Sequence, residues 1–153
     1  MKHYQSHSSL WLSAASVLLL VAPAQAQQSQ VTDIQLRSTE QGLEIFLQTQ
    51  NGERQQILTV RNGNDLVADI VNTQLQLPDG TNVFRQDNPA PGISSVVLTQ
   101  LDNNNARLIV TGTTTPPSGQ IAGRNQQGIL LSFSPGDNFS RGNTPAQSMA
   151  PPP

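Results

Sequence analysis

The chain has 153 residues, no cysteine, eight basic residues against ten acidic ones, and only 4% aromatic residues. The absence of cysteine excludes disulfides, thiolate metal sites and cysteine catalysis. The slightly negative charge and the scarcity of aromatic residues argue against nucleic-acid binding, because that function needs a basic surface and side chains that stack on bases.

Residues 1–26 have the features of a secretory signal peptide. Lys2 supplies a positive start, residues 10–21 form an apolar core, and Ala24-Gln25-Ala26 offers a cleavage site between small residues. The alternative is an uncleaved membrane anchor, but the apolar run is shorter than the roughly 20 residues that a spanning helix needs. We therefore expect cleavage after Ala26, which removes both histidines and leaves seven arginines against ten acids.

After a polar leader at residues 27–30, alternation of apolar and polar residues predicts strands at 31–36, 43–48, 56–60 and 66–71. Asn51-Gly52 and Asn62-Gly63 are two-residue hairpin signals, because both residue types tolerate positive φ. The first half of the domain is therefore predicted to be an antiparallel run of four strands.

Residues 73–92 are rich in proline and glycine and predict a long crossover, with a possible short strand at 75–77. Four more strands are predicted at 93–101, 106–111, 120–123 and 129–134. These strands repeat the pattern of the first half, and the shift between matching positions is constant and equal to that between Arg61 and Arg124. The repeat favours two equivalent halves, and the alternative is that the strands alternate alike by chance. The sequence thus predicts an all-β protein, a β-sandwich of about eight strands in two equivalent four-strand halves over residues 31–134.

Thirteen apolar residues of these strands are predicted to fill the core. They are Ile34, Leu43, Ile45, Leu47, Leu66, Ala68, Ile70, Val97, Leu108, Val110, Ile129, Leu131 and Phe133. Beyond them the alternation stops, and residues 135–153 are predicted to be a disordered, proline-rich tail or linker.

The strand that begins at Leu66 carries one acid in an otherwise apolar run. By the period of two, Asp69 lies on the opposite face from Leu66, Ala68 and Ile70. Asp69 is either exposed on a sheet face, where it can accept hydrogen bonds from amides or amines of a ligand, or is satisfied by Arg61 or a loop amide.

Three arginines complete the candidate ligand-binding set with Asp69: Arg61, Arg107 and Arg124. Arg61 and Arg124 occupy equivalent places, one before the last strand of each half. Each guanidinium can bind a carboxylate through two parallel hydrogen bonds, and the alternative is an arginine that is merely solvated. No metal site and no cofactor is predicted.

Catalysis is not expected, because the mature chain has neither histidine nor cysteine. Two carboxylates four residues apart on one strand, such as Asp65 and Asp69, are separated by about 13 Å at roughly 3.3 Å per residue, too far for a glycosidase pair. A carboxylate in a cleft with a strongly raised pKa would instead favour an enzyme. The mature chain also lacks the tryptophan and tyrosine of sugar-stacking platforms.

Four stretches resemble the AMIN domain family. They are Val31-Thr32-Asp33-Ile34-Gln35-Leu36, Gly42-Leu43-Glu44-Ile45, Leu66-Val67-Ala68-Asp69-Ile70-Val71-Asn72 and Gly92-Ile93-Ser94-Ser95-Val96. The resemblance implies a β-sandwich of two sheets in a periplasmic or cell-envelope protein, where the domain binds or localises to peptidoglycan. It also implies that Asp69 is the family's strand acid.

Residues 69–75, 77–80 and 87–93 more narrowly resemble the AMIN domain that precedes the plug and barrel of TonB-dependent siderophore receptors. Two functional hypotheses follow. The chain is either a non-catalytic envelope module whose partner is peptidoglycan, or the truncated or split N-terminal domain of an outer-membrane receptor that serves iron uptake. The edges of its sheets can also add a strand from a partner.

Overall fold

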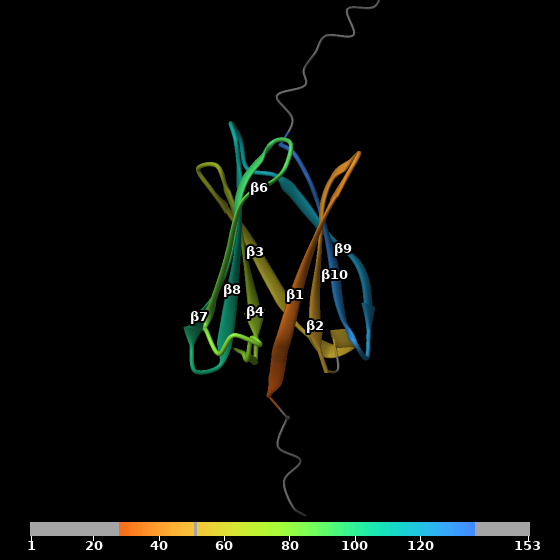
Figure 1. The fold of residues 1–153 in the computed structure, drawn as a ribbon, viewed down its shortest axis with the longest axis vertical. Helices are drawn as coiled ribbons and strands as arrows, with labels where there is room; N and C mark the ends of the chain where they lie inside the picture. Colours follow the sequence, from red (N-terminus) through yellow and green to blue (C-terminus); the bar gives the residue numbers. More distant parts are fainter. Residues whose placement is uncertain (1–27, 51, 137–153) are drawn as a thin grey trace, which may run out of the picture.

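The computed structural model describes residues 28–50 and 52–136, and these fold into two β-sheets packed face to face (Figure 1). The described residues form ten strands and one short 3-10 helix: β1 (Ser29–Thr39), β2 (Gly42–Thr49), η1 (Gly52–Arg54), β3 (Ile57–Asn62), β4 (Asp65–Val71), β5 (Thr73–Leu75), β6 (Val83–Ala90), β7 (Ile93–Asp102), β8 (Asn105–Gly112), β9 (Ser118–Asn125) and β10 (Gly128–Ser134). The predicted all-β sandwich is therefore confirmed.

The number of strands differs from the predicted eight. The two further strands, β5 and β6, lie in the proline-rich segment that was expected to be a crossover. The short strand suggested there at 75–77 is found as β5, two residues earlier, whereas β6 was not expected. β6 escapes a pattern search because it is an edge strand that carries Arg85, Asp87 and Pro89, and proline is tolerated at an edge, where its missing N–H faces solvent.

Each sheet takes strands from both halves of the chain. The first sheet has the order β5-β1-β2-β10-β9, and the second has the order β3-β4-β8-β7-β6. The expected continuous run of four strands is wrong, because the β1–β2 hairpin lies in one sheet and the β3–β4 hairpin in the other. Packing the two hairpins face to face buries the apolar side of both, which a single sheet would leave exposed. Accordingly, β2 leads into η1 rather than into a hairpin at Asn51-Gly52.

The repeat offset of the sequence extends to strand pairing. The shift that carries Arg61 onto Arg124 also carries the bounds of β2 onto those of β8, and the bounds of β4 onto those of β10. In the first sheet Leu47 of β2 lies opposite Ile129 of β10, and in the second sheet the equivalent Val110 lies opposite Leu66. The two halves thus exchange one hairpin each, while β5 and β6 have been added outside this repeat.

The core lies between the two sheets and matches most of the prediction. Eleven of the thirteen expected residues are buried, and Ile34 is half-buried against them. The prediction for Val97 is wrong: this residue lies half-buried on the outer side, and its neighbours Val96 and Leu98 are fully buried instead. The cause is a register irregularity between Ile93 and Ser95, which moves β7 by one residue relative to β8.

The β3–β4 hairpin presents Asp69 on the outer side of the second sheet. Asn62 pairs with Asp65, so the turn consists of Gly63 (φ 58°) and Asn64, one residue later than expected. Within β4 the residues Leu66, Ala68 and Ile70 are buried, and the alternate residues, including Asp69, are half-buried. The predicted two-faced strand is confirmed.

The N-terminal boundary lies earlier than expected, because β1 begins at Ser29 within the predicted leader and Ser29 pairs with Thr73 of β5. The signal peptide prediction for residues 1–26 lies outside the described residues, as does nearly all of the tail predicted for residues 135–153. Among the residues that the structure describes, no helix has the length and apolar character needed to span a membrane.

Candidate functional site

Asp69 and Arg107 form an ion pair on the outer face of the second sheet. They lie directly opposite each other on the neighbouring antiparallel strands β4 and β8. Nε of Arg107 donates to Oδ1 of Asp69 at 2.7 Å, and Nη2 donates to Oδ2 at 2.9 Å. Both side chains remain about one third exposed, 35% for Arg107 and 29% for Asp69. The contact is therefore a bidentate pair that is still within reach of a ligand.

The ion pair fixes the charge of both groups. Hydrogen bonding from Arg107, together with its charge, lowers the pKa of the Asp69 carboxyl below its ordinary value, against the opposing effects of burial and of Asp102. Asp69 in turn raises the pKa of the Arg107 guanidinium. A carboxyl that is held ionised is a poor proton donor at neutral pH, so Asp69 lacks the raised pKa that would favour an enzyme.

The residues around the pair form two rows across all five strands of the second sheet. The first row consists of Leu58, Asp69, Arg107, Thr99 and Val83, each opposite the next on adjacent strands. The second row consists of Val60, Val67, Ile109, Val97 and Arg85. We call these ten residues the outer face of the second sheet. Six of the ten residues are apolar, and the Asp69–Arg107 ion pair lies near the centre of this face.

The structure places Arg61 and Arg124 away from this pair. Arg61 pairs in register with the buried Leu66, so it lies on the inner side of β3, and its Nη2 donates to Oγ of Ser118 at 3.3 Å. Arg124 lies at the equivalent position of β9, where its Nη1 donates to the backbone oxygen of Gln55. The alternative in which Arg61 satisfies Asp69 is wrong, because Arg107 does so.

The first sheet carries a different surface at the positions equivalent by the repeat. There, Ser132 of β10 lies opposite Glu44 of β2, in the places that Asp69 and Arg107 occupy in the second sheet. Next to Glu44 is an unpredicted, shallow polar hollow around the β1–β2 turn. It is lined by Arg37, Ser38, Thr39, Glu40, Gln41 and Glu44. Polar residues at a turn give no periodic signal that distinguishes a hollow from solvated surface.

Within the described residues, no group of three histidine, cysteine, aspartate or glutamate side chains is arranged to hold a metal ion. Asp69 engages two of the five N–H bonds of Arg107 and fixes the orientation of the planar guanidinium, which leaves further donors for a carboxylate, carbonyl or hydroxyl.

The structure thus combines two five-stranded sheets with a bidentate ion pair on the outer face of the second sheet. The family model of the AMIN domain matches residues 33–133, about two thirds of the chain, and the protein belongs to this family. AMIN domains are non-catalytic periplasmic modules that bind or target peptidoglycan. No solved structure matches the chain.

Proposed function

We propose that this chain localises a protein to peptidoglycan in the periplasm without catalysing a reaction, and that the outer face of the second sheet makes the contact. The observation that carries the proposal is the guanidinium of Arg107, which two hydrogen bonds to Asp69 orient near the centre of a partly exposed, largely apolar face. Membership of the AMIN family supports the periplasmic address and the wall polymer as ligand.

The chemistry of peptidoglycan fits this face. Its peptide stems carry carboxylates and amides, which pair with the remaining N–H groups of Arg107, and its sugars carry hydroxyls and methyl groups. Leu58, Val60 and Val83 are between 52% and 60% exposed around the pair, so they offer apolar contacts to stem methyl groups. Because the oriented guanidinium loses little freedom on binding, each hydrogen bond that it donates contributes more to affinity.

Co-sedimentation with isolated sacculi tests the proposal. We expect the purified protein to pellet in a saturable manner and Arg107→Ala to bind about tenfold more weakly, the equivalent of about 1.4 kcal/mol for a lost charge-assisted contact. Arg37→Ala is the matched control, because it removes an arginine from the hollow on the other sheet. Failure of the wild type to pellet would refute wall binding, and equal losses in the two variants would refute the choice of face.

A second candidate function is the N-terminal domain of a TonB-dependent siderophore receptor, serving iron uptake with the receptor as partner. It is supported by the resemblance of residues 69–75, 77–80 and 87–93. In the structure these residues cover the end of β4, all of β5, the loop after it, the end of β6 and the start of β7. Reading the coding sequence beyond Pro153 tests it: an in-frame plug and barrel would support the receptor, and a stop codon with no neighbouring receptor gene would count against it.

A further inference from the structure

Three of the four sheet edges are protected against strand addition. β5 has only three residues, and the backbone N–H of its Leu75 donates to the Gln100 side chain. β6 carries the Arg85–Asp87 ion pair, a proline and a register irregularity. β9 has two glycines and a register irregularity opposite Leu130. Charges, proline and bulges are the usual devices that prevent edge-to-edge pairing.

The fourth edge, β3, has none of these devices over residues 57–60. It contains no glycine or proline, it pairs with β4 without interruption, and Leu58 and Val60 are 55% and 60% exposed. Val71 N donates to Gln56 O, so by the alternation of an antiparallel pair the even-numbered residues of β3 bond to β4. The backbone groups of Ile57, Thr59 and Arg61 therefore point to the open side, and no described residue bonds to them.

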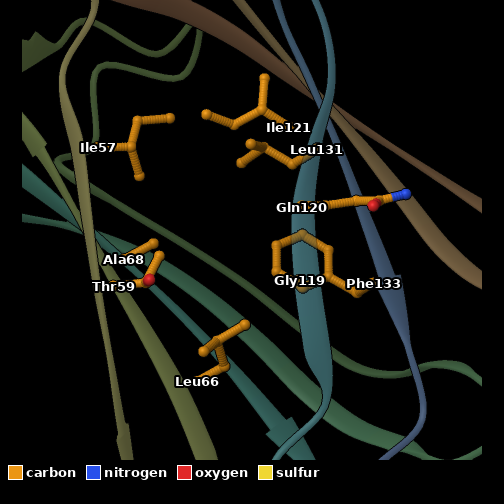
Figure 2. Close-up of a pocket in the computed structure, with 9 residues that line it drawn as sticks. All are labelled: Ile57, Thr59, Leu66, Ala68, Gly119, Gln120, Ile121, Leu131 and Phe133. Atoms are coloured by element: carbon orange, nitrogen blue, oxygen red, sulfur yellow. The ribbon is translucent and has the colours of Figure 1, made fainter.

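An apolar groove lies beside this edge (Figure 2). It is a cavity of about 190 Å³ between the edge strands β3 and β9, and its walls include Ile57, Thr59, Leu66, Ile121 and Phe133. Gly119 also lines the groove, where a Cβ atom would lie only 2.6 Å from Leu66 Cδ2. The residues Ile57 and Thr59 thus have side chains in the groove and backbone groups at the open edge. A strand added to β3 would place its inward side chains over this cavity.

The charges at this edge favour an acidic partner. Arg54 precedes the strand, Arg61 lies near its end and Arg124 lies across from it on β9. None of the three is ion-paired with a carboxylate of the described residues. Glu53 is the one acid of η1. A second copy of this chain would bring a further Arg54 and Arg61 to the same edge, and like charges in close apposition oppose association.

We propose that β3 is a docking edge that accepts an extended, acidic segment of a partner protein as the sixth strand of the second sheet. The partner's backbone pairs with Ile57, Thr59 and Arg61, its alternate apolar side chains enter the groove, and its carboxylates meet Arg61 and Arg54. This site is separate from the proposed wall-binding role of Arg107, so either can fail without the other.

A blocked peptide of sequence Asp-Thr-Val-Thr-Val-Thr-Asp, whose valines and aspartates share one face of a strand, is the probe, measured against the purified protein by calorimetry at low salt. We expect saturable binding that weakens at least about tenfold in Thr59→Pro, because proline removes an N–H that points to the open side. Val83→Pro is the control, because it removes an N–H from the open side of the other edge strand, β6. Gln100 N donates to Asn82 O, so Asn82 bonds to β7 and the backbone of the next residue, Val83, points away from it. We expect it to bind within about twofold of wild type.

Further readouts separate docking from a folding defect and from wall binding. Thr59→Pro should keep a cooperative thermal transition and its binding to sacculi, and amide exchange at Ile57, Thr59 and Arg61 should slow when peptide binds wild type. A peptide with lysine in place of both aspartates, or one with alternate amides methylated, should bind at least about tenfold more weakly. The proposal would be overturned if the wild type did not bind the peptide, or if a control peptide bound as tightly as the probe. It would also be overturned if Val83→Pro lost as much affinity as Thr59→Pro, or if the wild type formed a dimer that Thr59→Pro abolished.

Discussion

At the scale of single residues, the contact between Asp69 and Arg107 is the feature that most shapes the outer face of the second sheet. Asp69 and Arg107 were both identified as candidates from sequence, but not as a pair. Their strands, β4 and β8, are adjacent in the sheet yet far apart in the chain, and no periodicity predicts such a neighbour. The predicted equivalence of halves did not reveal the pair either, since it relates Asp69 to Ser132 and Arg107 to Glu44.

The lowered pKa of Asp69 predicts a pH dependence of stability. A carboxyl whose pKa is lowered by folding contributes stability above its unfolded pKa of about 3.9, and that contribution is lost as pH falls through the folded-state value. The melting temperature of wild type should therefore exceed that of Asp69→Asn at pH 7, and the difference should shrink towards pH 2. A constant difference between wild type and Asp69→Asn would contradict the assignment.

A double-mutant cycle measures the pair itself. Urea unfolding of wild type, Asp69→Asn, Arg107→Gln and the double variant should give a coupling free energy of about 0.5 to 1.5 kcal/mol, since the geometry is bidentate but both side chains are about one third exposed. The exposed Arg85–Asp87 pair, whose atoms approach to 2.7 Å, is the matched comparison and should give a smaller value. Coupling that is zero at Asp69–Arg107 would show that the contact is not maintained in solution.

At the scale of elements, the hairpins were predictable and their pairing was not. Local patterns predicted β2, β4, β8 and β10 nearly to the residue, because one face of each is buried and one is not. The prediction of which β7 residues face the core was wrong, because a register irregularity at residues 93–95 shifts the buried face by one residue. Such a bulge leaves no mark in the hydrophobic alternation of the sequence. β6 was missed, since its stability comes from pairing with β7 rather than from an apolar pattern.

The phase of β7 can be checked with two neighbouring substitutions. Val96 is fully buried and Val97 is half-buried on the outer side, so Val96→Ala should lower the free energy of unfolding by about 2 kcal/mol and Val97→Ala by less than about 1 kcal/mol. Denaturant unfolding monitored by circular dichroism gives both values. The reverse ranking would restore the register that the sequence pattern alone predicted.

The start of β2 depends on a glycine. Gly42 has φ 140°, and a Cβ atom there would overlap the backbone oxygen of Phe133 on β10. Gly42→Ala should therefore destabilise the protein by about 3 kcal/mol or more, through strain and through displacement of β10. Gly80 also has positive φ (73°) but open space around it, so Gly80→Ala should cost only about 1 kcal/mol. Equal thermal shifts in the two variants would rule out the close approach of β2 and β10.

At the scale of the whole molecule, the sandwich has two unlike outer faces built on one repeated plan. Each half of the chain contributes one hairpin to each sheet, and the core is the shared product of both. The repeat is kept where side chains are buried and is lost on the surface, where Asp69 and Arg107 correspond to Ser132 and Glu44. This difference is what distinguishes a proposed binding face on the second sheet from the polar hollow on the first.

Export of the molecule is expected from the signal-like segment 1–26 and is tested by protein chemistry. Expression in a bacterial host with a periplasm should yield a secreted form whose N-terminal sequence begins at Gln27, since cleavage is expected after Ala26. Leu18→Arg and Leu19→Arg together, which interrupt the apolar core, should trap an uncleaved precursor. If the wild-type protein instead keeps residues 1–26 and is found in the membrane fraction, the segment acts as an uncleaved membrane anchor.

Nuclear magnetic resonance with soluble peptidoglycan fragments can map directly the surface of the protein that binds the wall polymer. We expect the backbone amide signals of β4 and β8 near Asp69 and Arg107 to shift in a saturable manner, and these shifts to be lost in Arg107→Ala. Shifts confined to the hollow around Arg37 and Glu44, or no saturable shifts at all, would contradict the claim that the outer face of the second sheet binds peptidoglycan.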